Sequence, residues 1–114
     1  MTTNPAIPSP TRFEVEEPEL APLFHLVLLD DDQHTYDYVI EMLGAIFGYS
    51  VEKAWTLARV VDTQGRVILE TASRERCEGH QTRIHAYGAD PRMPNSLGSM
   101  SAIIEEAGTP GEAG

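Results

Sequence analysis

Apolar residues follow two distinct periods in the first half of the chain and predict one strand and two helices. The run from Phe24 to Leu29 is short and apolar at nearly every position, which is typical of a buried strand. From Thr35 to Phe47 the apolar residues recur at helical spacing. A second helix is predicted between Ser50, which can cap its first turn, and Gly65, which can end it. Its buried face is predicted to comprise Val51, Ala54, Trp55, Ala58 and Val61.

The second half of the chain predicts two more strands and a third helix. A short strand runs from Arg66 to Thr71, and a helix capped by Ser73 runs to about Tyr87, with Cys77, Ile84 and Tyr87 inward. A loop covers 90–99, and a last strand covers 100–104. The order β-α-α-β-α-β predicts an α+β sandwich: a three-stranded antiparallel sheet with three helices on one face.

The two ends of the chain differ in composition from its centre. Residues 1–22 hold five of the eight prolines and four glutamates, a composition that buries little and predicts a disordered arm. Residues 108–114 are rich in Gly, Pro and Ala and predict a flexible tail. The folded core is therefore expected over residues 23–107.

Charge and composition exclude several classes of protein. Lys and Arg number 8 against 18 Asp and Glu, a formal net charge of −10. Such a chain is poorly suited to neutralising nucleic-acid phosphates or binding an anionic membrane surface. No apolar run approaches the roughly 20 residues of a membrane span, and the single cysteine, Cys77, has no partner for an internal disulfide. We expect a cytoplasmic protein.

Candidate chemistry concentrates at Asp30, Asp31, Asp32 and His34, between the first strand and the first helix. Asp32 or Thr35 can cap that helix. Three adjacent acids exceed what capping needs, so two of them are expected to face solvent or a positively charged ligand. A divalent-cation site at these four residues is an alternative, although the interrupted spacing of a calcium loop is absent.

The remaining residues give no indication of an enzyme or a cofactor. There is no Gly-rich phosphate loop, and Cys77 falls on a predicted buried stripe. His25, His80 and His85 lack a nucleophile or a paired acid at motif spacing. From the residues alone, the chain is an interaction module with an acidic corner.

Three stretches share their pattern with a known family. They are Leu26-Val27-Leu28-Leu29-Asp30-Asp31-Asp32-Gln33-His34-Thr35 with the following Tyr38-Val39-Ile40-Glu41-Met42-Leu43, the turn Phe47-Gly48-Tyr49-Ser50, and Val61-Asp62-Thr63-Gln64-Gly65-Arg66-Val67 with Ser73-Arg74-Glu75 after it. Together they resemble the ClpS family, adaptors that bring N-degron substrates to the Clp protease. The resemblance covers residues 24–107.

This resemblance implies a pocket for the first residue of a substrate protein. The positions that hold the α-ammonium correspond to Asp30, Asp31 and Asp62, of which two differ from the family, and both differences give carboxylates. Three acids in one pocket repel each other, which raises the pKa of at least one of them. The side-chain pocket corresponds to His34, Tyr36, Val39, Ala58, Val61 and Met100, and the surface that meets the unfoldase to Glu75 and His80.

The sequence therefore predicts a non-enzymatic adaptor. It would bind N-terminal destabilising residues, with bulky apolar ones preferred, and deliver them to a Clp-type AAA+ unfoldase through the N-terminal arm. Its partners would be that unfoldase and proteins or peptides with a free N-terminus. A divalent-cation-binding protein, or a diverged protein-interaction module that uses the same acidic pocket, remains an alternative.

Overall fold

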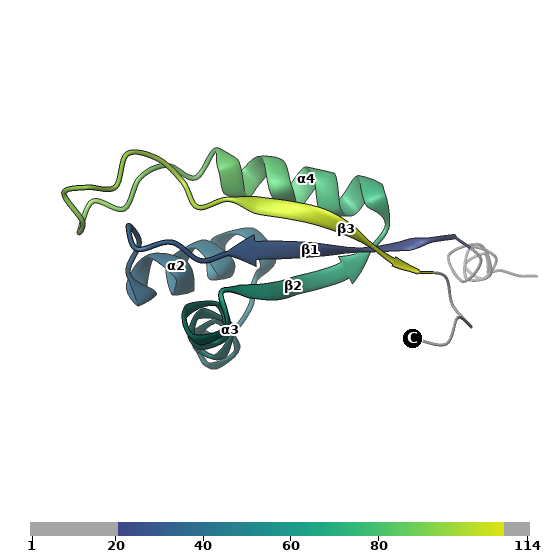
Figure 1. Ribbon diagram of the computed structural model, residues 1–114, viewed down its shortest axis with the longest axis horizontal. Coiled ribbons are helices and arrows are strands. Elements are labelled where there is room, and N and C mark those ends of the chain that lie inside the picture. Colours follow the sequence, from purple (N-terminus) through teal and green to yellow (C-terminus); the bar gives the residue numbers. More distant parts are fainter. Residues whose placement is uncertain (1–20, 109–114) are drawn as a thin grey trace, which may run out of the picture.

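The computed structural model describes residues 21–108, which form six elements in the predicted order (Figure 1). They are β1 (Leu23–Leu29), α2 (Tyr36–Phe47), α3 (Val51–Gln64), β2 (Arg66–Ala72), α4 (Arg74–His85) and β3 (Ala102–Gly108). The predicted α+β class is confirmed. No helix within this part of the chain is long and apolar enough to cross a membrane.

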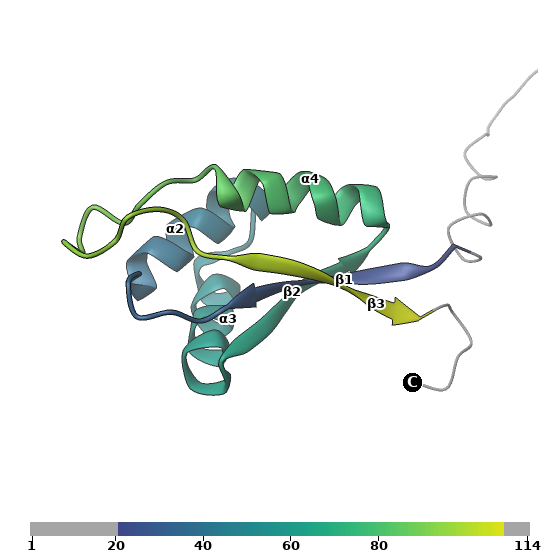
Figure 2. The ribbon, with the colours of Figure 1, turned by 45° about the horizontal axis from the view of Figure 1, so that its top comes forward.

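The sheet has the order β2-β1-β3, and both pairings are antiparallel. β1 is the central strand, and its consecutive residues Leu26, Val27 and Leu28 are fully buried, in agreement with its almost continuously apolar sequence. An irregularity in the β1–β2 pairing leaves Leu69 as an extra residue opposite the Leu26–Val27 step. In Figure 2 the loop from α4 to β3 and the start of α2 lie at one end of the sheet, and the start of β1 and the end of β3 lie at the other.

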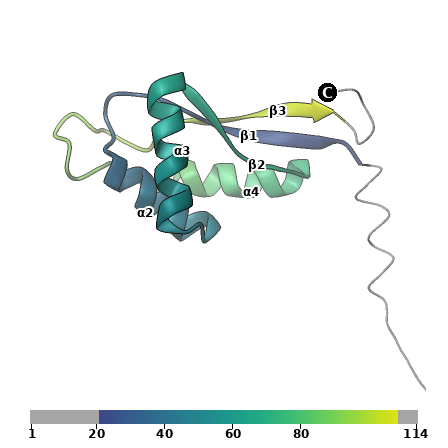
Figure 3. The ribbon, with the colours of Figure 1, turned by 90° about the horizontal axis from the view of Figure 1, so that it is seen from below.

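The core forms between the helices and the sheet face that carries Phe24, Leu26 and Leu28. In Figure 3, α2 and α3 lie toward one end of the strands, while α4 runs alongside them. Each helix begins at a hydroxyl cap, because Thr35, Ser50 and Ser73 each accept a backbone N–H from the third residue along. These caps fix where each helix starts, and therefore which side chains its first turn presents.

The predicted buried face of the second helix was wrong in two places. Val51 is 69% exposed and Trp55 is 45% exposed. The face of α3 that packs on the core is narrower and is made of Ala54, Ala58 and Val61. Small side chains on this face let the helix lie close to α2 and β2, and so Trp55 is left at the edge of the contact.

The ends of two other elements also differ from the prediction. Helix α4 ends at His85, and Tyr87 lies beyond it, 37% exposed, with its ring edge-on to Tyr38 at 5.5 Å. The last strand begins at Ala102 rather than Met100 and continues to Gly108. Met100 is instead buried beside the start of α2, in a segment that pairs with β1 only through a hydrogen bond from Leu29 N to the Ser101 carbonyl.

The predicted disordered arm and flexible tail lie almost entirely outside the described residues. Ala21 and Pro22 are exposed, and Gly108 pairs with Leu23 at the end of β3. Both predictions stay predictions.

Candidate functional site

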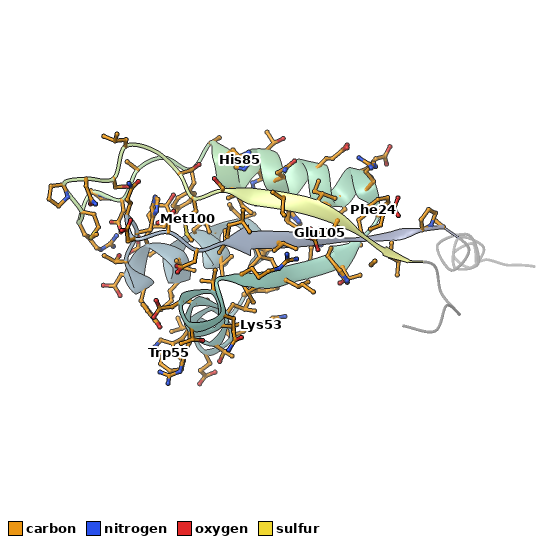
Figure 4. All side chains as sticks on the ribbon, in the orientation of Figure 1. Phe24, Lys53, Trp55, His85, Met100 and Glu105 are labelled. Atoms are coloured by element: carbon orange, nitrogen blue, oxygen red, sulfur yellow. The ribbon has the colours of Figure 1, made fainter. Side chains whose placement is uncertain are left out.

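A small open pocket lies where β1 ends and α2 begins, with about 300 Å³ of empty space including its mouth. All nine residues predicted to bind the first residue of a substrate line it, together with one more, Thr35: Asp30, Asp31, His34, Tyr36, Val39, Ala58, Val61, Asp62 and Met100. Figure 4 labels Met100 at this end of the molecule. The structure thus brings together residues from four segments of the chain.

Exposure divides the pocket lining into a mouth and a floor. Asp30, Asp31 and Asp62 are exposed, whereas the apolar residues Val39, Ala58, Val61 and Met100 are at most 4% exposed. Helix geometry explains how α3 contributes to both parts, because residues spaced by three and four share one face. The result is a pocket with anionic groups at its entrance and hydrocarbon at its base.

Asp30 is the mouth carboxylate with the fewest donors around it. Its backbone N–H extends the strand ladder to the Gly65 carbonyl, which fixes the residue at the end of β1. Partial burial, followed by the negative charge of Asp62, raises the pKa of the Asp30 carboxyl, and the backbone N–H of Asp31 offsets only part of this. A cation at Asp30 would favour the ionised carboxylate and so oppose both effects.

Asp31 is held by groups on its own side of the mouth. One oxygen accepts the Gln33 backbone N–H at 2.9 Å, and the carboxylate lies 2.8 Å from Nδ1 of His34. The other ring nitrogen of His34, Nε2, lies 2.7 Å from the carbonyl of Gly98. Since a carbonyl can only accept, Nε2 donates, and Nδ1 also donates to Asp31 when the ring carries its second proton. His34 therefore ties the loop before β3 to the pocket mouth.

Asp62 faces Asp30 from the opposite wall. The hydroxyl of Tyr36 donates to its Oδ2 at 2.7 Å, which leaves Oδ1 without a hydrogen-bond donor among the side chains of residues 21–108. This hydrogen bond to the carboxylate raises the pKa of Tyr36. Asp62 also lies in the last turn of α3, next to the negative end of the helix dipole and with no basic residue in that turn. At this position the carboxylate costs stability, so its presence is not explained by helix capping.

A fourth carboxylate, that of Asp90, holds the first turn of α2 in place. This role was not predicted from the sequence. It is 1% exposed, and its Oδ2 accepts both the backbone N–H of Thr35 at 2.7 Å and the Thr35 hydroxyl at 2.8 Å. Its Oδ1 accepts from the backbone and guanidinium of Arg92. Burial alone would raise the pKa of Asp90, but these hydrogen bonds outweigh burial and lower it to about 2.

No pattern in the sequence marks Asp90, because it lies in a loop with no period. Its guanidinium partner Arg92 also contacts Glu41 of α2, and so loop 88–101 is attached to the helix at more than one place. A partner 55 residues away along the chain is visible only in three dimensions.

The side chains around His34 do not form a nucleophile triad. Asp31, His34 and Ser96 follow one another in the order of a nucleophile triad, with Ser96 Oγ 3.3 Å from Nε2. However, Nε2 donates to the Gly98 carbonyl and cannot accept the serine proton in this arrangement. Both ring nitrogens of His34 are engaged, and residues 21–108 contain no group of three His, Cys, Asp or Glu side chains arranged to hold a metal ion.

The two residues predicted to contact an unfoldase lie on α4, away from the pocket. Glu75 is exposed in the first turn of that helix. His80 is partly buried, with Nδ1 2.6 Å from Glu70 and its ring 4.5 Å from that of Phe47. Their role as a contact surface stays a prediction.

Comparison with known proteins gives three concordant matches. The family described as ATP-dependent Clp protease adaptor protein ClpS matches residues 19–94. A ClpS adapter protein of Desulforapulum autotrophicum is 31% identical over 92 residues, which span 80% of this chain and 88% of the relative. The structure of Agrobacterium tumefaciens ClpS2 bound to L-phenylalaninamide has a TM-score of 0.64 at 18% identity, covering 75% of this chain and 96% of that one. At that identity the structural match shows the shared fold.

Proposed function

Since the chain belongs to the ClpS family of Clp protease adaptors, we propose that its pocket binds the first residue of a substrate protein through a free α-amine. The single observation that carries this proposal is the division of the pocket into an anionic mouth and an apolar floor. An N-terminal residue with an apolar side chain has the matching division, with a cationic ammonium next to hydrocarbon.

Electrostatics supports a cation as the natural occupant of the mouth. Partial burial, and after it the negative charge of Asp62, raises the pKa of Asp30. Charge-assisted hydrogen bonds from an ammonium to carboxylates are among the strongest available to a protein. The fold relative was solved with L-phenylalaninamide, a molecule that joins an amine to an apolar ring, and this agrees with the proposed ligand class.

The small size of the pocket suits a single side chain. Its empty space of about 300 Å³ includes the open mouth, so the enclosed part is small. The floor residue Ala58 has a small side chain and leaves room that a larger one would fill, while the Tyr36 ring forms part of the wall. We therefore propose bulky apolar first residues as ligands, with β-branched Ile and Val accepted.

Delivery of the bound protein to the AAA+ unfoldase is the second part of the proposal. We assign the contact surface to Glu75 and His80 on α4, and the handover to residues 1–22. A protein that lacks residues 1–21 is expected to bind peptides normally and to fail in degradation with its unfoldase.

The proposed function is tested with a panel of labelled peptides that differ only in their first residue. Fluorescence anisotropy should show binding of peptides that begin with Phe, Tyr, Trp, Leu, Ile or Val, and none when the same amine is acetylated. Equal binding of acetylated and free peptides, or binding that ignores the first residue, contradicts the proposal.

A further inference from the structure

One side of the pocket mouth continues into a patch formed by Trp55 and Arg59, which we call the rim patch. The Trp55 ring lies 6.4 Å from the ring of Tyr36, a pocket wall, and the Arg59 guanidinium lies 5.7 Å from the Trp55 ring. Both residues are exposed, one helical turn apart on α3. The patch is therefore a continuation of the pocket surface along one helix.

Arg59 forms no direct ion pair within residues 21–108, although Asp62 lies one turn further along the same helix. The arginine ion pairs in that part of the chain involve Arg66, Arg74, Arg76 and Arg92. Arg59 instead lies over an aromatic face, which holds a guanidinium without removing its charge. In a protein of net charge −10, an available cation beside a binding pocket is an exception to the overall field.

The side of the mouth at the end of β1 carries three exposed acids, Asp30, Asp31 and Asp32, whereas the α3 side carries Asp62 together with the cation of Arg59. A peptide whose first residue fills the pocket must leave through the mouth. An extended chain advances about 3.3–3.6 Å per residue, so its second or third side chain comes within reach of the rim patch. At the rim patch, an acidic side chain of the peptide would contact Arg59. On the side of Asp30, Asp31 and Asp32, the same side chain would be repelled.

We infer that Trp55 and Arg59 form a subsite for the residues that follow the first one, selecting an acidic side chain at the second or third position. This inference rests on the proposed function, because the subsite is defined by a peptide anchored in the pocket. Trp55 provides an apolar surface for the peptide backbone, and Arg59 provides the charge that discriminates between peptides.

Peptides with a constant Phe at the first position and Glu, Ala or Lys at the second and third positions test the inference. The wild-type protein should bind the Glu peptide about fivefold more tightly than the Lys peptide, the range expected for an exposed ion pair. The overall negative charge alone predicts the opposite order. Arg59→Gln should abolish or reverse the preference for Glu.

Lys53→Gln is the matched control, because it removes the same charge from the same helix. Lys53 lies over the Tyr49 ring at 3.9 Å, and Figure 4 shows it projecting from a different side of α3 than Trp55. This variant should keep the preference for Glu. If Lys53→Gln lowers it as much as Arg59→Gln does, the effect belongs to net charge and the inference is overturned.

Trp55 gives an independent readout, since it is the single tryptophan of the chain. Its fluorescence should change more when the Glu peptide binds than when phenylalaninamide, which fills only the pocket, binds. Amine-dependent binding with no preference at the second and third positions overturns the subsite and leaves the proposed function intact. Absence of amine-dependent binding overturns the proposed function, and the subsite with it.

Discussion

Carboxylates lie on two sides of the start of α2, at the pocket mouth and in the loop that holds Asp90. They differ in their exposure and in the number of hydrogen-bond donors around them. Asp90 is buried and accepts hydrogen bonds on both oxygens, which lower its pKa to about 2. Asp30 is exposed at the pocket mouth, has few donors and faces Asp62, and its pKa is raised. Asp90, whose two oxygens are both occupied by donors from the protein, holds the start of α2 in place. Asp30, which accepts from no protein side chain within residues 21–108, is available to a ligand.

The largest effect that separates the two groups should be on ligand binding. Asp30→Asn keeps the shape of the side chain and removes the charge, so the affinity for a peptide with a free amine should weaken by about 2–5 kcal/mol. Anisotropy titration measures the change. Asp32→Asn, one position outside the residues that line the pocket, is the matched control and should bind nearly as wild type does.

Asp90 should show the reverse pattern, with the main effect on stability. Asp90→Ala leaves the Thr35 donors and Arg92 without their acceptor, and so the free energy of unfolding should fall by about 2–4 kcal/mol. Because the folded pKa lies below the ordinary value of 3.8, this contribution is present above about pH 4 and is lost as pH falls toward 2.

Urea unfolding measured at several pH values checks this prediction. The stabilities of wild type and Asp90→Ala should converge as the solution becomes more acidic. A difference that persists unchanged at the lowest pH would show that Asp90 acts through packing rather than as a charged acceptor. Asp37→Ala removes an exposed acid from the first turn of α2, serves as the control, and should lower stability by less than about 1 kcal/mol.

The apolar floor can be altered without touching either group of acids. Ala58→Met adds three heavy atoms to a pocket-lining position that is 1% exposed. We expect binding of peptides that begin with Ile or Val to weaken by about tenfold, or 1.4 kcal/mol, with Leu peptides spared. Unchanged Ile-to-Leu ratios in a folded variant would mean that Ala58 does not contact the ligand.

The smallest predicted effect concerns the stability cost of Asp62. Removing a negative charge from the last turn of α3, and from the vicinity of Asp30, should raise the free energy of unfolding by about 0.3–1 kcal/mol in Asp62→Asn. The same variant should bind peptide more weakly. A variant that is both less stable and equally good at binding would place Asp62 with Asp90, as a structural carboxylate.

Most of the fold could be predicted because period, caps and turn residues agree along this chain. The strand at β1, the three hydroxyl-capped helices and the order of the elements are all visible in the sequence. Trp55 was misplaced because a large aromatic side chain at a helical interval is indistinguishable, in one sequence, from a core residue. Only packing shows that alanines form the contact instead.

The pocket residues were placed by resemblance to a family, and the structure gathers them around one cavity. What the sequence could not show is how they are held. The Asp90 bonds to Thr35 and the His34 bond to Gly98 connect segments more than 50 residues apart, and no local pattern encodes such pairs. The donors around a carboxylate decide its pKa, and so the difference between Asp30 and Asp90 appears only in the folded chain.

The pKa of the Asp30 carboxyl, measured by NMR titration with and without a saturating peptide, tests the central claim most directly. In the free protein it should lie above the ordinary value of 3.8, because of burial and the charge of Asp62. A bound ammonium stabilises the ionised form, so binding should lower this pKa, and affinity should fall as pH drops through the free value. An Asp30 pKa that is the same with and without peptide would contradict the account.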